Sequence, residues 1–269
     1  MIENYAKIAF RNFRKRIGYT FINVAGLAIG VACCLLISIY VLNELSYDRF
    51  IEDADRIYRI KQIPTSSSDQ LPSALSPFQT GPFLQAEYPR LIEQQVRLYD
   101  TRDEAHTFLN EADEISFRTP DFFFTDSTFF SMFGAELVRG NPDNVLDSPL
   151  SLVISEEVAE RLYPDEDPIG KTLRYKGISA MEMTINGIMK NWPEESHMSP
   201  NMLGSFTSLD ILYSRNPDYE DNWWSNSIWT YIKLTDGITP SELENQLPAF
   251  ADKYYHPNRP EGETVRLEL

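Results

Sequence analysis

The sequence predicts an α+β protein with an N-terminal amphipathic helix and one transmembrane helix, followed by an extracytoplasmic body of strands and helices. Three observations support this prediction. Residues 20–42 form an uncharged apolar run that is long enough to span a bilayer. Residues 56–99 and 228–269 each show strand-like alternation on both sides of a helical pattern. The region between them is rich in phenylalanine and proline, which predicts a mixed α/β lobe inserted between two strand–helix–strand halves.

Residues 1–17 predict an amphipathic helix on the cytoplasmic side of the membrane. On a helical wheel their apolar side chains share one arc, and the opposite arc carries the bases Lys7, Arg11, Arg14 and Lys15. A helix of this kind lies in the membrane interface with its charges toward anionic headgroups. The alternative is a plain basic flank that only sets the topology of the next segment.

Residues 18–45 predict transmembrane helix 1. The 23-residue run from Thr20 to Leu42 has no charged residue and, at about 1.5 Å per residue, reaches roughly 34 Å. A cleaved signal peptide would have an apolar core of only about 7–15 residues, and this run continues past any small-x-small site. A lipoprotein signal is disfavoured because Gly30, three residues before Cys33, is not branched.

The charges around this helix predict its orientation. Five basic residues precede it and several acids follow it, so the positive-inside rule places the N-terminus in the cytoplasm and the body outside. The formal net charge is −16 although the N-terminus is basic, so the body is strongly acidic and unsuited to binding nucleic acid. The only cysteines, Cys33 and Cys34, lie inside the apolar run, so the body has neither a disulfide nor a thiolate metal site.

One face of the apolar run predicts packing on another transmembrane helix. Gly26 and Gly30 form a G-x-x-x-G motif that lets a partner backbone approach, and Asn23 and Cys33 extend the same face. Asn23 could hydrogen-bond across such an interface. Glycine is common in membrane helices, so a lipid-facing surface is the alternative.

The two outer halves of the body share one order of elements. In the first half, alternation predicts strands at 56–63 and 91–99 with a helix at 77–88 between them. In the second half, a strand at 228–234 precedes the capping box that starts at Thr239, which predicts a helix to about Tyr254. A further strand begins at Val265 and the chain ends within it, so we expect a fragment of a longer protein.

The inserted lobe is expected to hold an aromatic core, a capped helix and short strands. Its phenylalanines cluster between 122 and 133, and Ser155 precedes Glu156 and Glu157 in the manner of a helix N-cap. Apolar alternation predicts strands at 173–175 and 183–188.

No catalytic or metal-binding motif is recognisable. The three histidines, His106, His197 and His256, lack the paired spacing of a zinc site, and no nucleophile elbow or phosphate-binding loop occurs. The acidic run at 165–167 lacks the spacing of a calcium loop. The tryptophans could stack on a ligand, but packing in the core or an interface is the favoured interpretation. We therefore expect no enzymatic activity, cofactor or metal in this chain.

Several separated blocks resemble the MacB-like and FtsX-like family of ABC transporter permeases. The first comprises the basic helix, the apolar run and the motif from Leu45 to Phe50. Others follow in the family's order across essentially the whole chain: Asp126-Ser127-x-Phe129-Phe130, Arg139-Gly140-Asn141-Pro142, Pro168-Ile169-Gly170-Lys171-Thr172-Leu173 and Pro193 to His197. The common order of these blocks is far more specific than any one of them.

The resemblance implies a periplasmic core domain at 46–269, with a porter-like part at 46–114 and 204–269 and an inserted lobe at 115–203. It implies a homodimeric permease of the bacterial inner membrane, whose ATP hydrolysis resides in a partner ATPase subunit. Its function would be export or mechanotransmission, in which ATP-driven movement passes through membrane helices to the periplasm. A second permease copy, the bilayer and a periplasmic adaptor or substrate are the other implied partners. None of the blocks carries over as a catalytic residue.

This sequence departs from the family in one respect. The family has three more transmembrane helices after the periplasmic domain and contacts its ATPase between two of them, and residues 1–269 contain none of these. The alternative function is a single-span membrane-anchored sensory or ligand-binding module, although only about 17 residues would lie inside the cell to relay a signal. A membrane-anchored hydrolase is disfavoured because no nucleophile or metal set is recognisable.

Overall fold

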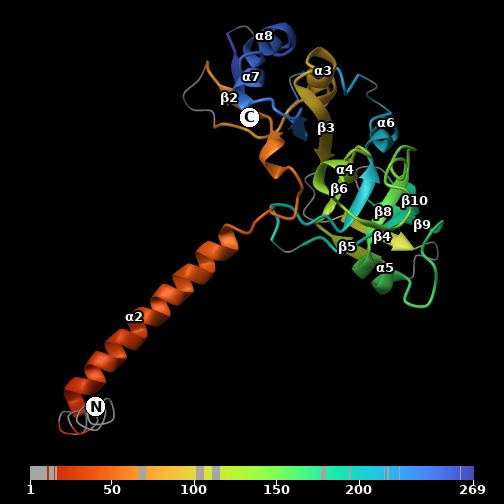
Figure 1. Cartoon of the computed structure of the whole chain (residues 1–269). Helices are drawn as coiled ribbons and strands as arrows, with labels where there is room; N and C mark the ends of the chain where they lie inside the picture. The colour runs from red at the N-terminus through yellow and green to blue at the C-terminus, as the bar shows by residue number, and fades with distance from the viewer. Residues whose placement is uncertain are drawn as a thin grey trace. The chain divides into compact units, whose positions relative to one another are not determined.

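The structure of the protein is a computed structural model that describes residues 11, 15, 17–66, 71–100, 106–110, 116–176, 180–193, 195–214, 216, 218–223, 225–260 and 262–269. The chain divides into two compact units, Met1–Asp48 and Arg49–Leu269. The first unit contains one long helix, and the second is a sheet with short helices around it (Figure 1).

The long helix, α2 (Ile17–Glu44), contains the predicted apolar run. It has no proline and no charge between Thr20 and Leu42, so its backbone hydrogen bonds continue without a break. None of its side chains is buried within the described chain, and Ile22 and Leu27 are each 70% exposed. A surface this apolar is favourable in hydrocarbon and unfavourable in water.

The second unit is built on one mixed sheet, which has 11 strands among the described residues. The neighbours β6 and β11 are parallel, as are β8 and β10, and the other pairs are antiparallel. A short strand, β7 (Leu137–Arg139), pairs with the end of β10. Along the sheet the strands follow the order β1 (Ile57–Arg59), β12 (Trp229–Leu234), β3 (Ile92–Tyr99), β6 (Phe122–Thr125), β11 (Met202–Ser205), β8 (Ser151–Ser155), β10 (Ala180–Met189), β9 (Thr172–Lys176), β4 (His106–Asn110) and β5 (Ser116–Thr119).

A separate two-stranded sheet joins β2 (Lys61–Pro64) to β13 (Val265–Glu268). The prediction of one continuous strand over 56–63 is therefore wrong, because the structure divides this segment into two strands at Ile60. The side chain of Ile60 is fully buried, and its N–H donates to the Thr230 carbonyl at 3.0 Å. This bond continues the pairing with β12 by one residue, and from Lys61 onward the chain pairs with β13 instead.

Helices occupy the predicted places in both outer halves, with one correction. The first is α3 (Thr80–Glu87). The Thr239 N–H donates to the Glu242 carboxylate at 2.8 Å, so the capping box starts α7 (Pro240–Glu244) as predicted. The unbroken helix expected to Tyr254 is wrong, because Pro248 lacks the N–H that a continuous helix needs. The segment instead contains α8 (Leu247–Phe250), the π-helix η3 (Ala251–Tyr255) and the 3-10 turn η4 (His256–Asn258).

The remaining helices are short. The hydroxyl of Ser155 accepts from the Val158 N–H at 3.3 Å, which confirms the predicted N-cap of α5 (Glu156–Leu162). The strands predicted at 173–175 and 183–188 lie within β9 and β10 and are also confirmed. The others are η1 (Ala54–Arg56), α4 (Phe129–Phe133), η2 (Phe206–Ser208) and α6 (Leu209–Leu212).

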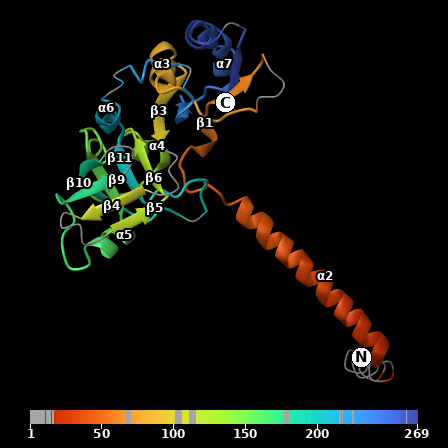
Figure 2. The same cartoon turned by 180° about the vertical axis from the view of Figure 1, so that it is seen from behind.

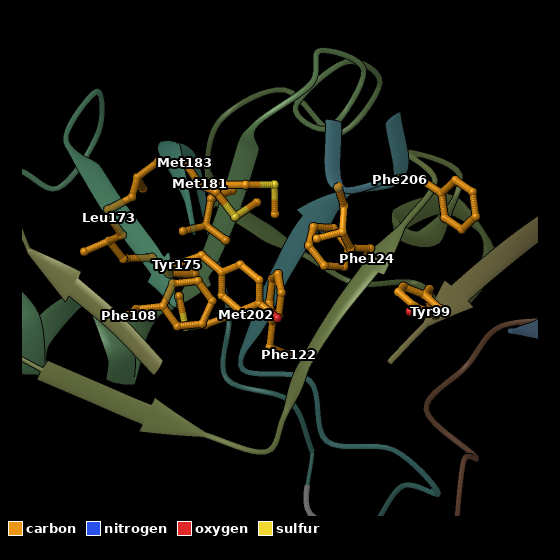
Figure 3. Packing of buried hydrophobic residues seen from close by; sticks show 14 of the residues in the cluster. Tyr99, Phe108, Phe122, Phe124, Leu173, Tyr175, Met181, Met183, Met202 and Phe206 are labelled. Carbon is orange, nitrogen blue, oxygen red and sulfur yellow. The ribbon is translucent and has the colours of Figure 1, made fainter. Parts of the chain in front are cut away.

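Among the described residues of the second unit, apolar side chains form three buried clusters. Alternation along β6 sends Phe122 and Phe124 into one cluster, with ring centroids 4.7 Å apart (Figure 3). Phe123 points instead toward the second cluster, against Trp229. Phe122 also lies 5.0 Å from Phe108 on β4. Each fully buried phenylalanine contributes about 1.5–3 kcal/mol relative to exposure.

The third cluster joins the first and last parts of the body. It contains Ile60 and Leu84 from the first half with Leu247 and Phe250 from the second. Accordingly α3 and α7 lie at one end of the sheet, and α5 lies beside β4 and β5 at the other (Figures 1 and 2). The two outer strand–helix–strand halves therefore share a core.

Candidate functional site

The predicted packing face of the membrane helix is open in the structure. Asn23, Gly26, Gly30 and Cys33 lie on α2 at spacings of three and four residues and are all exposed. A Cβ placed on Gly26 or Gly30 would meet nothing within 4 Å. The geometry leaves room for a second helix backbone along this face, and packing there stays a prediction.

The predicted interfacial bases fall partly on described residues. Arg11 and Lys15 are helical and exposed, four residues apart on one side of the chain. Lys7 and Arg14, with most of the predicted amphipathic helix, lie outside the described residues.

Residues 49–56, which we call the linker, connect the membrane helix to β1. The ring of Phe50 meets Trp192 edge-on at 5.4 Å, and Trp192 lies 5.5 Å from Phe129 on α4. The side chain of Ile51 is 7% exposed and belongs to the same buried cluster as Phe129. Apolar contacts therefore fix the start of the linker on the body.

Charged side chains fix the end of the linker. Arg56 contacts Asp53 at 2.5 Å and Glu93 of β3 at 2.8 Å, while Lys233 of β12 contacts Asp53 at 2.9 Å and Glu93 at 3.7 Å. Arg56 also donates to the carbonyl of Leu234 at 2.8 Å. We call the four charged residues the linker clamp.

The clamp is electrically balanced, and its two cations are shielded from water while its two carboxylates are about half exposed. The side chains of Lys233 and Arg56 are 11% and 19% exposed. Hydrogen bonds from Lys233 and Arg56 hold the pKa of the Asp53 carboxyl below its usual value. Hydrogen bonds to Glu93 and Asp53 raise the pKa of the Arg56 guanidinium. Asp53 and Arg56 are thus each stabilised by an opposite charge from another segment.

A second ionic contact lies where β3 meets β6. Arg97 of β3 binds the Asp126 carboxylate through two nitrogens, at 2.8 and 3.0 Å, and lies over the Phe206 ring at 3.7 Å. The Arg97 and Asp126 side chains are 13% and 17% exposed. We call this pair the Arg97 junction.

Side chains replace missing ladder bonds at the same place. β3 and β6 share only two register pairs, Leu98 with Thr125 and Tyr99 with Phe124. Beyond them the Asp126 carboxylate accepts from the Arg97 N–H at 3.0 Å, and the Thr128 hydroxyl donates to the Gln95 carbonyl at 2.8 Å. The backbone of β3 is therefore satisfied there by side chains rather than by a neighbouring strand.

Sequence patterns did not single out the clamp or the junction. Arg56 is separated from Glu93 by 37 residues and from Leu234 by 178. The only signal was the block beginning at Asp126, which resembled the family without suggesting an ion pair.

Aromatic and histidine side chains serve packing. Trp223 is 7% exposed and stacks on Tyr254 at 5.0 Å, in agreement with the packing interpretation, and Trp224 lies outside the described residues. His106 is buried, and its Nδ1 atom lies 3.2 Å from the Tyr175 hydroxyl oxygen. The Nε2 atom of His197 lies 2.9 Å from the Tyr231 hydroxyl oxygen. Among the residues that the structure describes, no three potential ligands gather to hold a metal.

Comparisons with solved structures place this fold among permease domains. A domain of a candidate permease protein from Porphyromonas gingivalis is 23% identical, with a TM-score of 0.66 over 81% of this chain and 90% of that one. The periplasmic region of MacB from Actinobacillus actinomycetemcomitans is 14% identical, with a TM-score of 0.51 over 82% and 92%. The extracellular domain of YknZ, a noncanonic ABC-type transporter from Gram-positive bacteria, is 14% identical, with a TM-score of 0.51 over 77% and 99%.

The sequence comparisons agree with the fold. No curated protein matches the sequence. The family described as the MacB-like periplasmic core domain matches residues 20–250, which is most of the chain and includes the linker, the clamp and the junction. The chain therefore belongs to the MacB-like periplasmic core domain family.

Proposed function

We propose that this chain is the N-terminal part of a permease subunit of an ABC transporter, which serves export or mechanotransmission across the inner membrane. The observation that carries the proposal is the order of its parts. A helix long and apolar enough to cross a membrane leads directly, through a linker fixed by apolar and ionic contacts, into a MacB-like core domain.

The proposed topology places the N-terminus in the cytoplasm and the body in the periplasm. Basic residues before α2 and acids after it support this orientation. Tyr19 and Tyr40 lie near the two ends of α2 and are 70% and 68% exposed. Their separation of about 32 Å along a helix suits the two interfaces of a bilayer, where tyrosine is enriched.

The proposed partners follow from the same parts. A second permease copy would pack on the face at Asn23, Gly26, Gly30 and Cys33, and Lys7, Arg11, Arg14 and Lys15 would contact anionic headgroups. ATP hydrolysis would reside in a cytoplasmic ATPase subunit, so the chain itself would have no enzymatic role. A periplasmic adaptor or substrate would contact the body.

We also propose the division of the body into a porter-like part, 46–114 and 204–269, and an inserted lobe, 115–203. The buried cluster that joins Ile60 and Leu84 to Leu247 and Phe250 supports a shared core for the outer segments. The phenylalanines of the intervening region at 122, 124, 129 and 133 are all fully buried, and Phe129 and Phe133 share their cluster with Val96 and Tyr231 of the outer segments.

Purification from native membranes tests this function. The permease carries an affinity tag and is extracted in mild detergent, and co-purifying proteins are identified and assayed for ATP hydrolysis. The expected result is an ABC ATPase in near-equal amount, with hydrolysis that vanadate inhibits. A permease that purifies from several detergents without any nucleotide-hydrolysing partner would contradict the proposal.

A further inference from the structure

We infer that the linker is the site at which movement of the membrane helix enters the sheet, and that the linker clamp passes this movement to β3 and β12. The inference rests on the proposed function, because it assumes that the membrane helix moves. It concerns residues for which the comparisons provide no role.

The covalent route through β1 is a weak attachment by itself. β1 has three residues and lies at the edge of the main sheet, where β12 is its one partner among the described strands. At Ile60 the chain leaves this sheet for the smaller one. A pull on the linker would load these three residue pairs first, and a short edge strand has no second neighbour to share the load.

The clamp supplies a second route from the linker into the sheet. Arg56 and Asp53 come from the linker, Lys233 from β12 and Glu93 from β3, so the ion pairs reach two strands beyond β1. Each cation contacts both anions, and Arg56 adds a hydrogen bond to a β12 carbonyl. Hydrogen bonds between ionised groups are about twice as strong as neutral ones and are directional.

An irregularity in the sheet places Glu93 in the clamp. The register between β12 and β3 shifts so that Lys233 is opposite Gln94 and Leu234 is opposite Ile92, which leaves Glu93 as an extra residue. Extra residues of this kind re-aim side chains out of the regular alternation. The Glu93 carboxylate can thereby meet Arg56 and Lys233 together.

The apolar contacts of the linker complete the attachment. Phe50 is held against Trp192, which packs on Phe129 of α4, and Ile51 is buried beside them. The linker is thus held at its start by apolar contacts and at its end by ion pairs. Two separate points of attachment resist rotation as well as displacement, whereas one point resists displacement alone.

Hydrogen exchange of the whole chain in nanodiscs tests the clamp without requiring transport. Lys233→Met removes the positive charge but keeps a side chain of similar length, and it should speed exchange of the Arg56 and Ile60 amides about tenfold. Lys233→Arg keeps the charge and should change exchange less than twofold. Lys190→Met, which breaks an exposed ion pair with Glu136, is the matched control and should leave these amides unchanged.

A second variant distinguishes a loss of folding from a loss of the contacts in the linker clamp. If Lys233→Met does not fold, Glu93→Gln breaks the link to β3 alone and should give the same local increase in exchange. Unchanged exchange at Arg56 and Ile60 in a folded Lys233→Met or Glu93→Gln variant would overturn the inference.

A second arm uses the permease–ATPase complex. ATP should alter exchange along β3 in the wild type, and Lys233→Met should abolish this response while ATP hydrolysis continues. An equal response in Lys233→Met would overturn the inference. No response to ATP in the wild type would count against the proposed function, while the nucleotide-free measurement would still decide whether the clamp holds the linker.

Discussion

Replacing Asp126 with asparagine tests the Arg97 junction directly. The substitution keeps the size of the side chain but removes its charge, so the Arg97 guanidinium, which is 13% exposed, loses its two-nitrogen contact and keeps only the longer ion pair with Glu220 at 3.5 Å. Breaking a buried ion pair costs about 3–5 kcal/mol. Partial exposure and the remaining amide oxygen reduce this cost, so we expect a loss of about 2–3 kcal/mol in the free energy of unfolding.

Thermal unfolding in detergent, followed by tryptophan fluorescence, measures the effect. A loss of this size corresponds to a fall of about 4–12 °C in Tm for a body of 150–250 residues. The matched control is Glu182→Gln, which affects a pair with Arg174 at 3.8 Å whose side chains are 69% and 37% exposed. An exposed pair contributes at most about 0.5–1 kcal/mol.

A double variant separates the ion pair from the packing around it. Arg97→Met with Asp126→Asn removes the charge that has lost its nearer partner and keeps an apolar contact with Phe206, so it should be more stable than Asp126→Asn alone. If Asp126→Asn lowers Tm no more than Glu182→Gln does, the junction does not stabilise the body and the reasoning fails.

The remaining predictions concern the core, the acid stability of the body and the membrane helix. Gly204→Ala should cost about 1–3 kcal/mol of unfolding free energy, because its Cβ would lie 2.9 Å from Met183 Cε and 3.0 Å from Phe122 Cζ. Gly18→Ala, with nothing within 4 Å, is the control, and an equal Tm for both variants would contradict the packing. Hydrogen bonds from Lys253 and Tyr254 lower the pKa of the Glu87 carboxyl below 4.5, so these bonds stabilise the fold above that pH and stop doing so as the pH falls below it. Denaturant titrations at pH 6 and pH 3 should show a smaller acid-induced loss of unfolding free energy for Glu87→Gln than for the wild type. Equal losses would refute this. Gly30→Leu should lower the cross-linked dimer yield in membranes, whereas Gly18→Leu should not; equal yields would exclude the proposed face. In a cysteine-free background, Glu160→Cys should react with an impermeant maleimide on intact spheroplasts, whereas Lys15→Cys should react only after lysis. The reverse labelling pattern would contradict the proposed topology.

The structural features that the sequence predicted correctly depend on neighbours in the chain. The caps at Ser155 and Thr239 involve residues three positions away, so composition and spacing were sufficient. The apolar run was equally local, because its length and lack of charge decide whether it can cross a bilayer.

The features that were missed depend on contacts between distant segments. Alternation continued through Ile60, but from Lys61 onward the chain pairs with β13 (Val265–Glu268) and no longer with β12. The clamp could not be predicted because a chain with 40 acidic residues offers many partners for each base. Only the shifted register at Glu93 selects one of them.

β3 links the clamp to the Arg97 junction. It carries Glu93 of the clamp and Arg97 of the junction, about 13 Å apart along one strand. On one side it pairs with β12 through six register pairs, and on the other it pairs with β6 through two. A displacement that enters at Glu93 would therefore move β12 and β3 together, because their ladder is long.

The strands beyond β6 would follow only through the short ladder and the side chains that extend it. Thr125 donates to the Arg97 carbonyl at 2.8 Å, Asp126 accepts from the Arg97 N–H, and Thr128 donates to the Gln95 carbonyl. These bonds lie where β1, β12 and β3 join the rest of the described sheet. The junction, more than the ladder, would thus decide whether the inserted region moves with the outer halves or independently of them.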